Sequence, residues 1–147
     1  MITNTEMIIR LVMAMVLGGL VGWEREIYRK PAGFRTHILV CLGSSLFTIL
    51  SFSFPCGPGF QAVDPSRIAA GIVMGIGFLG AGAILHGQGS VSGLTTAASI
   101  WVVAAIGMAA GSGFYMAAAV ATGLVVLVLF VLNKVEKYYI EKTSKPK

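Results

Sequence analysis

The feature that most restricts the fold is the near absence of charge over the middle of the chain. Between Arg35 and Lys134 the only ionised side chains are those of Asp64 and Arg67. Only 12% of all residues are charged and 56% are hydrophobic, whereas about a quarter of the residues of a soluble domain are charged. Because so few charges cannot cover a surface in water, the sequence predicts an all-α membrane protein that crosses the bilayer several times.

Five apolar segments, separated by short polar or glycine- and proline-rich turns, mark the expected membrane-spanning helices. Each segment has 17 to 19 residues, near the lower limit for crossing a hydrocarbon core of ~30 Å. We expect a bundle of about five transmembrane helices in a domain at residues 1–137, a short turn at 86–92 and a basic tail at 138–147. The expected helices are residues 7–23, 38–54, 67–85, 93–110 and 114–132.

The distribution of positive charge predicts the orientation in the membrane. With five crossings, the loop after the first helix and the carboxyl-terminal tail lie on the same side. That side carries nine lysines and arginines, against two on the other side. The positive side is the cytoplasmic one in multi-pass proteins. The amino terminus is therefore expected outside the cell, and the carboxyl terminus in the cytoplasm.

Three charged residues near the outer ends of helices need an explanation. Arg10 interrupts the first apolar segment, and we expect its side chain to extend to the nearby interface. Asp64 precedes Pro65 and is suited to cap the third helix and to pair with Arg67. Arg67 itself has two readings, which the sequence does not separate: its side chain reaches the interface, or it is part of a buried functional pair.

The one charge-dense internal stretch follows the first helix. In one interpretation it is a charged interfacial turn, in which Glu26 pairs with Arg29 or Lys30. In the other, Glu24 lies one residue past the apolar segment and points into the bundle. Arg35, at the start of the second helix, lies on the same side of the membrane.

Small residues recur at a spacing of four in four of the five helices. Lipid provides no hydrophobic drive for helix association, so close backbone packing of small residues holds such bundles together. We expect a compact bundle or an oligomer, with a dimer favoured. The glycines expected at helix contacts are Gly18, Gly22, Gly71, Gly75, Gly77, Gly80, Gly82, Gly107 and Gly111.

Cofactor and metal chemistry are not expected. Residues 75–80 match the GxGxxG dinucleotide fingerprint, but they lie in an apolar span, and no acidic residue follows between Asp64 and Glu136. The fingerprint requires a strand before it and an acidic residue about 20 positions later. The two histidines, His37 and His86, have no third ligand for a metal.

Enzymatic and nucleic-acid functions are also not expected. The two cysteines, Cys41 and Cys56, lie 15 residues apart, which is roughly 22 Å along a helix and too far for a disulfide within it. We expect them to be apolar filler. No nucleophile–histidine–carboxylate arrangement can be assembled from these residues. The net charge of +5 reflects positive residues on the cytoplasmic side of the membrane, so it does not indicate binding to nucleic acid.

An ordered set of motifs identifies a family. The chain carries GWERE at 22–26, PAGFRTH at 31–37, DPSRIA at 64–69, GIGFLGAG at 75–82 and GLTTAA at 93–98. This set resembles the MgtC/SapB family of bacterial inner-membrane proteins, and the resemblance covers nearly the whole chain. Longer members of that family carry a cytoplasmic ACT-like domain at the carboxyl terminus, so this chain is expected to be of the short form.

The resemblance implies a role in the bacterial plasma membrane. Members are linked to virulence, growth at low magnesium and stress adaptation, and they modulate ATP synthase, membrane potential and phosphate uptake. We therefore expect a regulator whose partners are the lipid bilayer and other membrane proteins, ATP synthase among them. The alternative is a transporter or channel for small ions or solutes, formed by an oligomer.

Both alternatives direct attention to the polar residues in these motifs. Hydroxyls at the start of the fourth helix face His86 only if the intervening turn is tight. The polar candidates for function are Glu24, Arg25, Glu26, Arg35, Thr36, His37, Asp64, Arg67, Thr95 and Thr96.

Overall fold

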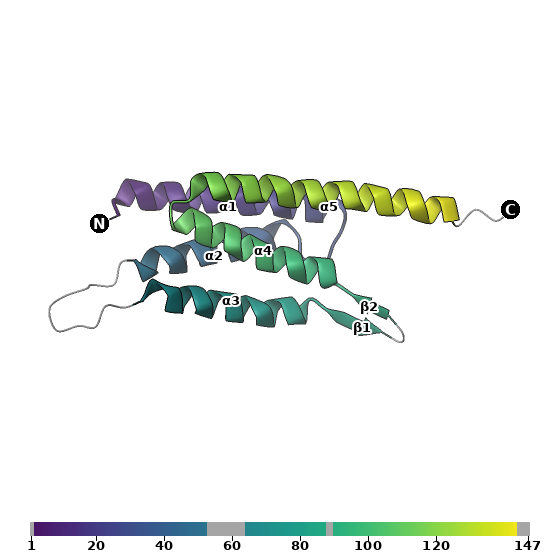
Figure 1. The fold of residues 1–147 in the computed structure, drawn as a ribbon, viewed down its shortest axis with the longest axis horizontal. Coiled ribbons are helices and arrows are strands. Elements are labelled where there is room, and N and C mark those ends of the chain that lie inside the picture. The colour runs from purple at the N-terminus through teal and green to yellow at the C-terminus, as the bar shows by residue number, and fades with distance from the viewer. Residues whose placement is uncertain (1, 53–63, 88–89, 144–147) are drawn as a thin grey trace.

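The computed structural model describes residues 2–52, 64–87 and 90–143, and for 85–87 and 136–143 the backbone alone. Five helices run roughly side by side, with a short hairpin between the third and the fourth (Figure 1). The elements are α1 (Asn4–Ile27), α2 (Phe34–Ser51), α3 (Pro65–Gly82), β1 (Leu85–Gly87), β2 (Ser90–Ser92), α4 (Leu94–Gly111) and α5 (Tyr115–Thr143).

The expected all-α membrane architecture is confirmed. In the described part of the chain, five helices are long and apolar enough to cross a membrane. The amino and carboxyl ends lie at opposite ends of the bundle (Figure 1). Which of these ends faces the cytoplasm stays a prediction from the charge distribution.

Close backbone contacts hold α2 between α1 and α4. A Cβ atom added to Gly18 or Gly22 of α1 would lie 2.6 to 2.9 Å from atoms of α2, closer than side chains can approach. The same holds for Gly107 and Gly111 of α4, which meet the α2 backbone at Cys41 and Ser45. Glycine is therefore required at these four positions for the helices to pack at this distance.

The glycines of α3 are placed differently. Gly80 approaches Ala97 of α4 at an ordinary contact distance of 3.7 Å for an added Cβ. The other four glycines of α3 have nothing within 4 Å of that position, so the close helix packing expected for them is not present within one chain. These four are Gly71, Gly75, Gly77 and Gly82.

The third helix ends three residues earlier than expected, at Gly82, because the chain turns into a hairpin. Strand β1 pairs antiparallel with β2, with Leu85 opposite Ser92. Gly93 then starts α4 with a positive φ of 88°, and a Cβ there would overlap the carbonyl oxygen of Ala83. The expected short turn at 86–92 is therefore a β-hairpin closed by a glycine that no other residue could replace without strain.

The second helix begins earlier than expected, at Phe34, because it has a cap from outside itself. Gly33 has no side chain to act as a cap, and the carboxylate of Glu26 accepts a hydrogen bond from the Phe34 amide at 3.0 Å. A Cβ on Gly33 would overlap that carboxylate. The helix ends at Ser51, and the expected continuation through residues 53 and 54, like Cys56, lies outside the described residues.

The first and fifth helices extend beyond the apolar segments that identified them. Thr3 caps α1 by accepting a hydrogen bond from the Glu6 amide at 3.3 Å, so α1 starts before the apolar run. Helix α5 continues from the expected end at residue 132 to Thr143. Lysine and glutamate favour helix, and the segment after residue 132 contains neither glycine nor proline until Pro146.

Candidate functional site

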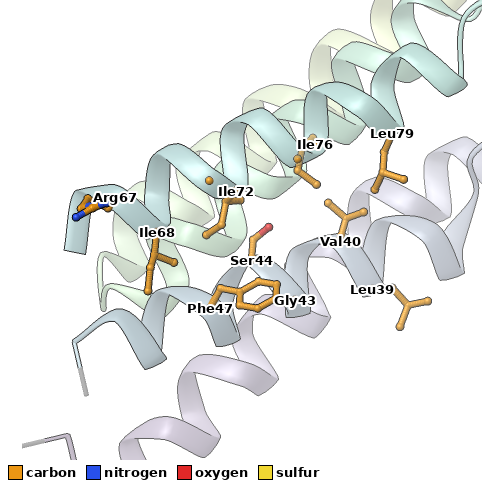
Figure 2. A pocket seen from close by; sticks show the side chains of 12 residues that line it. Leu39, Val40, Gly43, Ser44, Phe47, Arg67, Ile68, Ile72, Ile76 and Leu79 are labelled. Atoms are coloured by element: carbon orange, nitrogen blue, oxygen red, sulfur yellow. The ribbon is translucent and has the colours of Figure 1, made fainter. Parts of the chain in front are cut away.

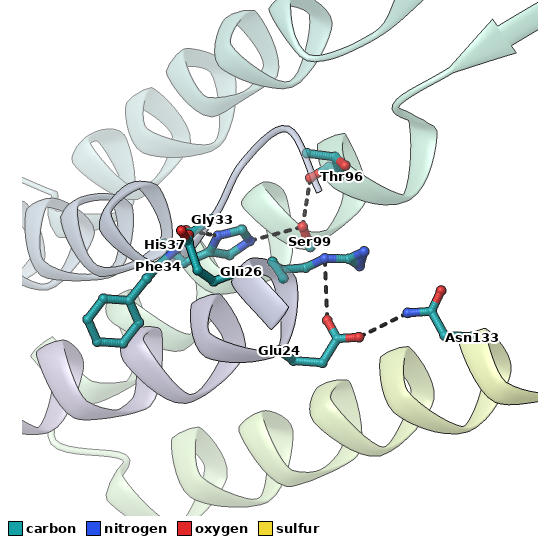
Figure 3. A network of polar contacts seen from close by, with 9 residues as sticks. Glu24, Glu26, Gly33, Phe34, His37, Thr96, Ser99 and Asn133 are labelled. Atoms are coloured by element: carbon teal, nitrogen blue, oxygen red, sulfur yellow. Dashed lines mark hydrogen bonds and ion pairs between the residues drawn. The ribbon is translucent and has the colours of Figure 1, made fainter. Parts of the chain in front are cut away.

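The ten polar candidates divide into buried and exposed groups. Four side chains are buried, with exposed fractions of 5% or less: Glu24, Arg25, His37 and Thr96. The other six are exposed or lie largely at the surface: Glu26, Arg35, Thr36, Asp64, Arg67 and Thr95. The buried four come from α1, α2 and α4, and belong to two groups that are held by hydrogen bonds and one ion pair (Figure 3).

The first group, which we call the Glu24 cluster, contains Glu24, Arg25 and Asn133. The Glu24 carboxylate lies 3.3 Å from Nε of Arg25, and its other oxygen accepts a hydrogen bond from the Asn133 amide at 2.9 Å (Figure 3). Arg25 is only 1% exposed. The interpretation in which Glu24 points into the bundle therefore describes the geometry, and the cluster joins α1 to α5.

The cluster is electrically neutral but not fully satisfied. Within the described residues, Nε and Nη1 of Arg25 have no hydrogen-bond partner, and neither does the Glu24 oxygen next to the arginine, so the two side chains form an ion pair without a hydrogen bond. A buried ion pair of this kind contributes little net stability, because desolvation offsets the attraction. Removing one partner is costly, since the other charge is then buried alone.

The second group, the His37 bridge, connects α2 to α4. His37 is fully buried. Its Nδ1 lies 2.9 Å from the carbonyl oxygen of Gly33, and its Nε2 lies 3.0 Å from the hydroxyl of Ser99. Ser99 in turn donates to the carbonyl oxygen of Thr96 at 2.8 Å. Both ring nitrogens are therefore engaged in contacts that join α2 to α4.

The chemistry of the bridge follows from what each partner can do. A carbonyl oxygen only accepts, so the proton on the neutral ring of His37 lies at Nδ1. Nε2 then accepts a hydrogen bond from the Ser99 hydroxyl. Because this hydroxyl has only one proton, its hydrogen bond to the carbonyl oxygen of Thr96 is then broken. In the protonated ring Nε2 donates instead, and Ser99 keeps its bond to Thr96.

The charged turn after α1 differs from the expected interfacial arrangement. In the described part of the chain, Glu26 forms no ion pair with Arg29 or Lys30, because its carboxylate caps α2 at Phe34. Arg29 has a positive φ of 50°, which reverses the chain direction directly after α1. The interpretation in which Glu26 pairs with Arg29 or Lys30 is therefore wrong, because the helix ends at Ile27, before either partner.

The extension of Arg10 to the membrane interface stays a prediction, whereas its contacts within the protein are defined. Its side chain is buried and donates to the carbonyl oxygen of Gly111 at 2.6 Å. It also pairs with Glu6, one turn earlier in α1. Gly111 is the last residue of α4, where carbonyl groups have no partner in the helix and the helix dipole favours a cation. Arg10 therefore caps α4 and ties it to α1.

Asp64 caps α3, as expected. Its carboxylate accepts hydrogen bonds from the amide of Ser66 at 2.9 Å and from its hydroxyl at 2.7 Å. These hydrogen bonds, together with the nearby charge of Arg67, hold the pKa of Asp64 below its usual value. The expected ion pair between Asp64 and Arg67 is not formed, and the guanidinium is exposed.

Two residues of these groups were missed by the sequence reasoning. Asn133 is the first amide after a long apolar run in α5, and that position was the available signal. Ser99 is one of the α4 hydroxyls considered only as facing His86 if the turn were tight, and it contacts His37. The side chain of His86 lies outside what the structure describes.

Glu24 also lines a cavity between α1 and α5. The cavity has a volume of about 540 Å³ and is otherwise bounded mainly by apolar side chains of the two helices, with Thr122 on the α5 side. Among the described residues, no three histidine, cysteine, aspartate or glutamate side chains come together in a way that could hold a metal ion.

Comparison with known proteins identifies relatives in several bacteria. A 47% identical relative from Escherichia coli K12 is named putative magnesium transporter YhiD, and the match covers 89% of this chain and 62% of the relative. Protein MgtC of Brucella abortus 2308 is 45% identical over 78% of this chain and 46% of its own length. Protein SrpB of Synechococcus elongatus is 37% identical over 87% of this chain and 75% of its own length.

The matched region corresponds to the helical bundle described above. The chain spans less than two thirds of the length of the Escherichia coli relative. No solved structure matches the chain. The model of the MgtC family matches residues 11–138, from within α1 to near the end of α5, so this multi-pass membrane protein belongs to the MgtC family.

Proposed function

We propose that the chain is a regulator of other membrane systems of the bacterial inner membrane, and that it acts through contacts made within the bilayer. The systems proposed from the family resemblance are ATP synthase and the membrane potential, in adaptation to magnesium or phosphate stress and in virulence. The proposal includes assembly into a homo-oligomer, with a dimer favoured, and it assigns the chain no catalytic step.

The observation that supports this proposal is the uncovered outer face of α3. Only 11% of the α3 span is buried, against 50% of the α4 span. Met74 and Phe78 are 73% and 81% exposed, and Gly77 between them has nothing within 4 Å of an added Cβ. A small residue flanked by large apolar ones permits close approach of another helix.

Site-specific photocrosslinking tests the proposal. A photoreactive phenylalanine analogue at position 78 should give a discrete adduct with another membrane protein in cells grown at low magnesium. The same analogue at Ile9 of α1, which is 49% exposed, is the matched control. Adducts of equal size and yield at both positions, or adducts with lipid alone, would contradict the regulator proposal.

Transport of a small cation is the second candidate. It is favoured by the name of the Escherichia coli relative, a putative magnesium transporter, and by the carboxylate of Glu24 at the cavity between α1 and α5. Against it, the charge of Glu24 is already balanced by Arg25 at 3.3 Å. Flux through purified protein in liposomes separates the two candidates, because only a transporter loses flux when Glu24 is replaced by glutamine.

A further inference from the structure

A groove of about 680 Å³ separates α2 from α3. Its walls are mainly aliphatic: Ile68, Ile72 and Ile76 of α3 point toward α2, where Val40 and Phe47 lie opposite (Figure 2). The groove exists because glycines stand where side chains would otherwise fill it. Gly43, Gly71 and Gly75 all line it, and none has an atom within 4 Å of an added Cβ.

One cation lies at the end of this groove. Among the described residues that line it, Arg67 is the only charged one, and Figure 2 shows its guanidinium at the start of α3, beyond Ile68. Residues 67, 71 and 75 are spaced by four, so the arginine and the two glycines share one face of α3. In the described part of the chain Arg67 forms no ion pair, since Asp64 bonds to Ser66 instead.

This combination matches the chemistry of a phospholipid. A guanidinium presents several N–H donors in a planar fork, which suits the oxygens of a phosphate. Below it, the groove offers a narrow aliphatic channel. From Arg67 to Leu79 the groove follows α3 for a rise of about 18 Å, close to half of the ~30 Å hydrocarbon core, which is the depth of one acyl chain in one leaflet.

We propose that the groove binds one acyl chain of a phospholipid whose headgroup phosphate is held by Arg67. The site stands independently of the regulator proposal, because it requires no protein partner. It places the lipid in the leaflet at the end of the bundle where α3 begins.

A second copy of the chain fits this groove less well. In a two-fold symmetric dimer each surface meets its own copy. A dimer packed through Gly71 and Gly75 would therefore bring the Arg67 residues of the two chains toward each other across the axis. Two like charges at a membrane interface repel, whereas a phosphate neutralises the guanidinium.

Photolabelling in nanodiscs tests the proposal. The probe is phosphatidylglycerol with a photoreactive group midway along one acyl chain, mixed into unlabelled lipid, and the readout is the yield of labelled α2 and α3 peptides. A Cβ added at Gly75 has no atom within 4 Å, so Gly75→Leu places its side chain in the groove. We expect labelling of the groove to fall about tenfold in this variant and in Arg67→Gln, as for loss of a binding contact.

Gly82→Leu is the matched control, because it adds the same side chain to the same helix outside the groove lining, at a position where an added Cβ has no atom within 4 Å. Its labelling should equal that of the unaltered protein, and thermal unfolding in detergent checks that all variants fold. Unchanged labelling of the groove in Gly75→Leu or in Arg67→Gln would overturn the proposal. Crosslinks from the groove to a second chain in place of lipid would also overturn it.

Discussion

Replacing Gly107 by alanine should separate the two helices at the centre of the bundle. The added Cβ would overlap the carbonyl oxygen of Cys41 and lie 2.9 Å from its carbonyl carbon, whereas ordinary contact starts at 3.4 Å. These atoms belong to the backbone of α2 and cannot rotate away. Helices α2 and α4 must therefore move apart by at least about 0.5 Å, which would also stretch the bond between His37 and Ser99.

The magnitude follows from three contributions. Overpacking of a close contact costs about 1 to 3 kcal/mol, and weakening of one buried hydrogen bond costs up to about 1.5 kcal/mol. Alanine regains about 0.5 to 1 kcal/mol, because it restricts the unfolded chain more than glycine does. The expected net change is a loss of about 2 kcal/mol in the free energy of unfolding.

Reversible unfolding in mixed micelles, followed by circular dichroism, measures this change. Gly123→Ala is the matched control, since Gly123 lies within α5 with nothing within 4 Å of an added Cβ. The control should be as stable as the unaltered protein or slightly more stable. Equal stability of Gly107→Ala and Gly123→Ala would refute the reasoning that backbone contact of α2 with α4 holds the bundle together.

Three further perturbations test the polar contacts. Gly33→Ala should displace the carboxylate that caps α2, with a loss of about 1 kcal/mol and faster hydrogen exchange in the first turn of α2. Arg25→Met should leave Glu24 buried without its charge partner and lower the free energy of unfolding by roughly 3 to 5 kcal/mol; adding Glu24→Gln should restore much of the loss, and no recovery in the double variant would contradict the ion pair. The cap at Asp64 should stabilise α3 at neutral pH and be lost only as the pH falls through its lowered pKa; an NMR titration of this carboxyl with a midpoint at or above the usual aspartate value would show the cap to be absent.

The architecture was predictable from the sequence because hydrophobicity over a membrane-length segment is a local property. Long apolar runs locate the five helices without knowledge of their neighbours. The glycine pairs of α1 and α4 follow the same logic, since small residues at a spacing of four mark faces that can approach closely. That pattern does not say which helix approaches them, so it could not distinguish Gly107, which meets α2, from Gly75, which meets open space.

The polar contacts were less predictable because their partners lie far apart in the chain. The side chain of Arg10 bonds to a carbonyl group 101 residues later in the chain. The partner of Glu24 on α5 is 109 residues away, and Ser99 meets a histidine 62 residues away. The positions of the apolar segments along the sequence indicate the depth of each such residue in the membrane. They do not indicate which helices are neighbours.

Ion flux through the purified protein tests most directly the central claim that this chain regulates other systems and does not itself carry ions. Liposomes that contain the protein and an entrapped magnesium indicator should show the same magnesium influx as empty liposomes under a concentration gradient and an imposed membrane potential. The Glu24→Gln variant should not differ from either. Influx well above that of empty liposomes, and lost in Glu24→Gln, would contradict the claim.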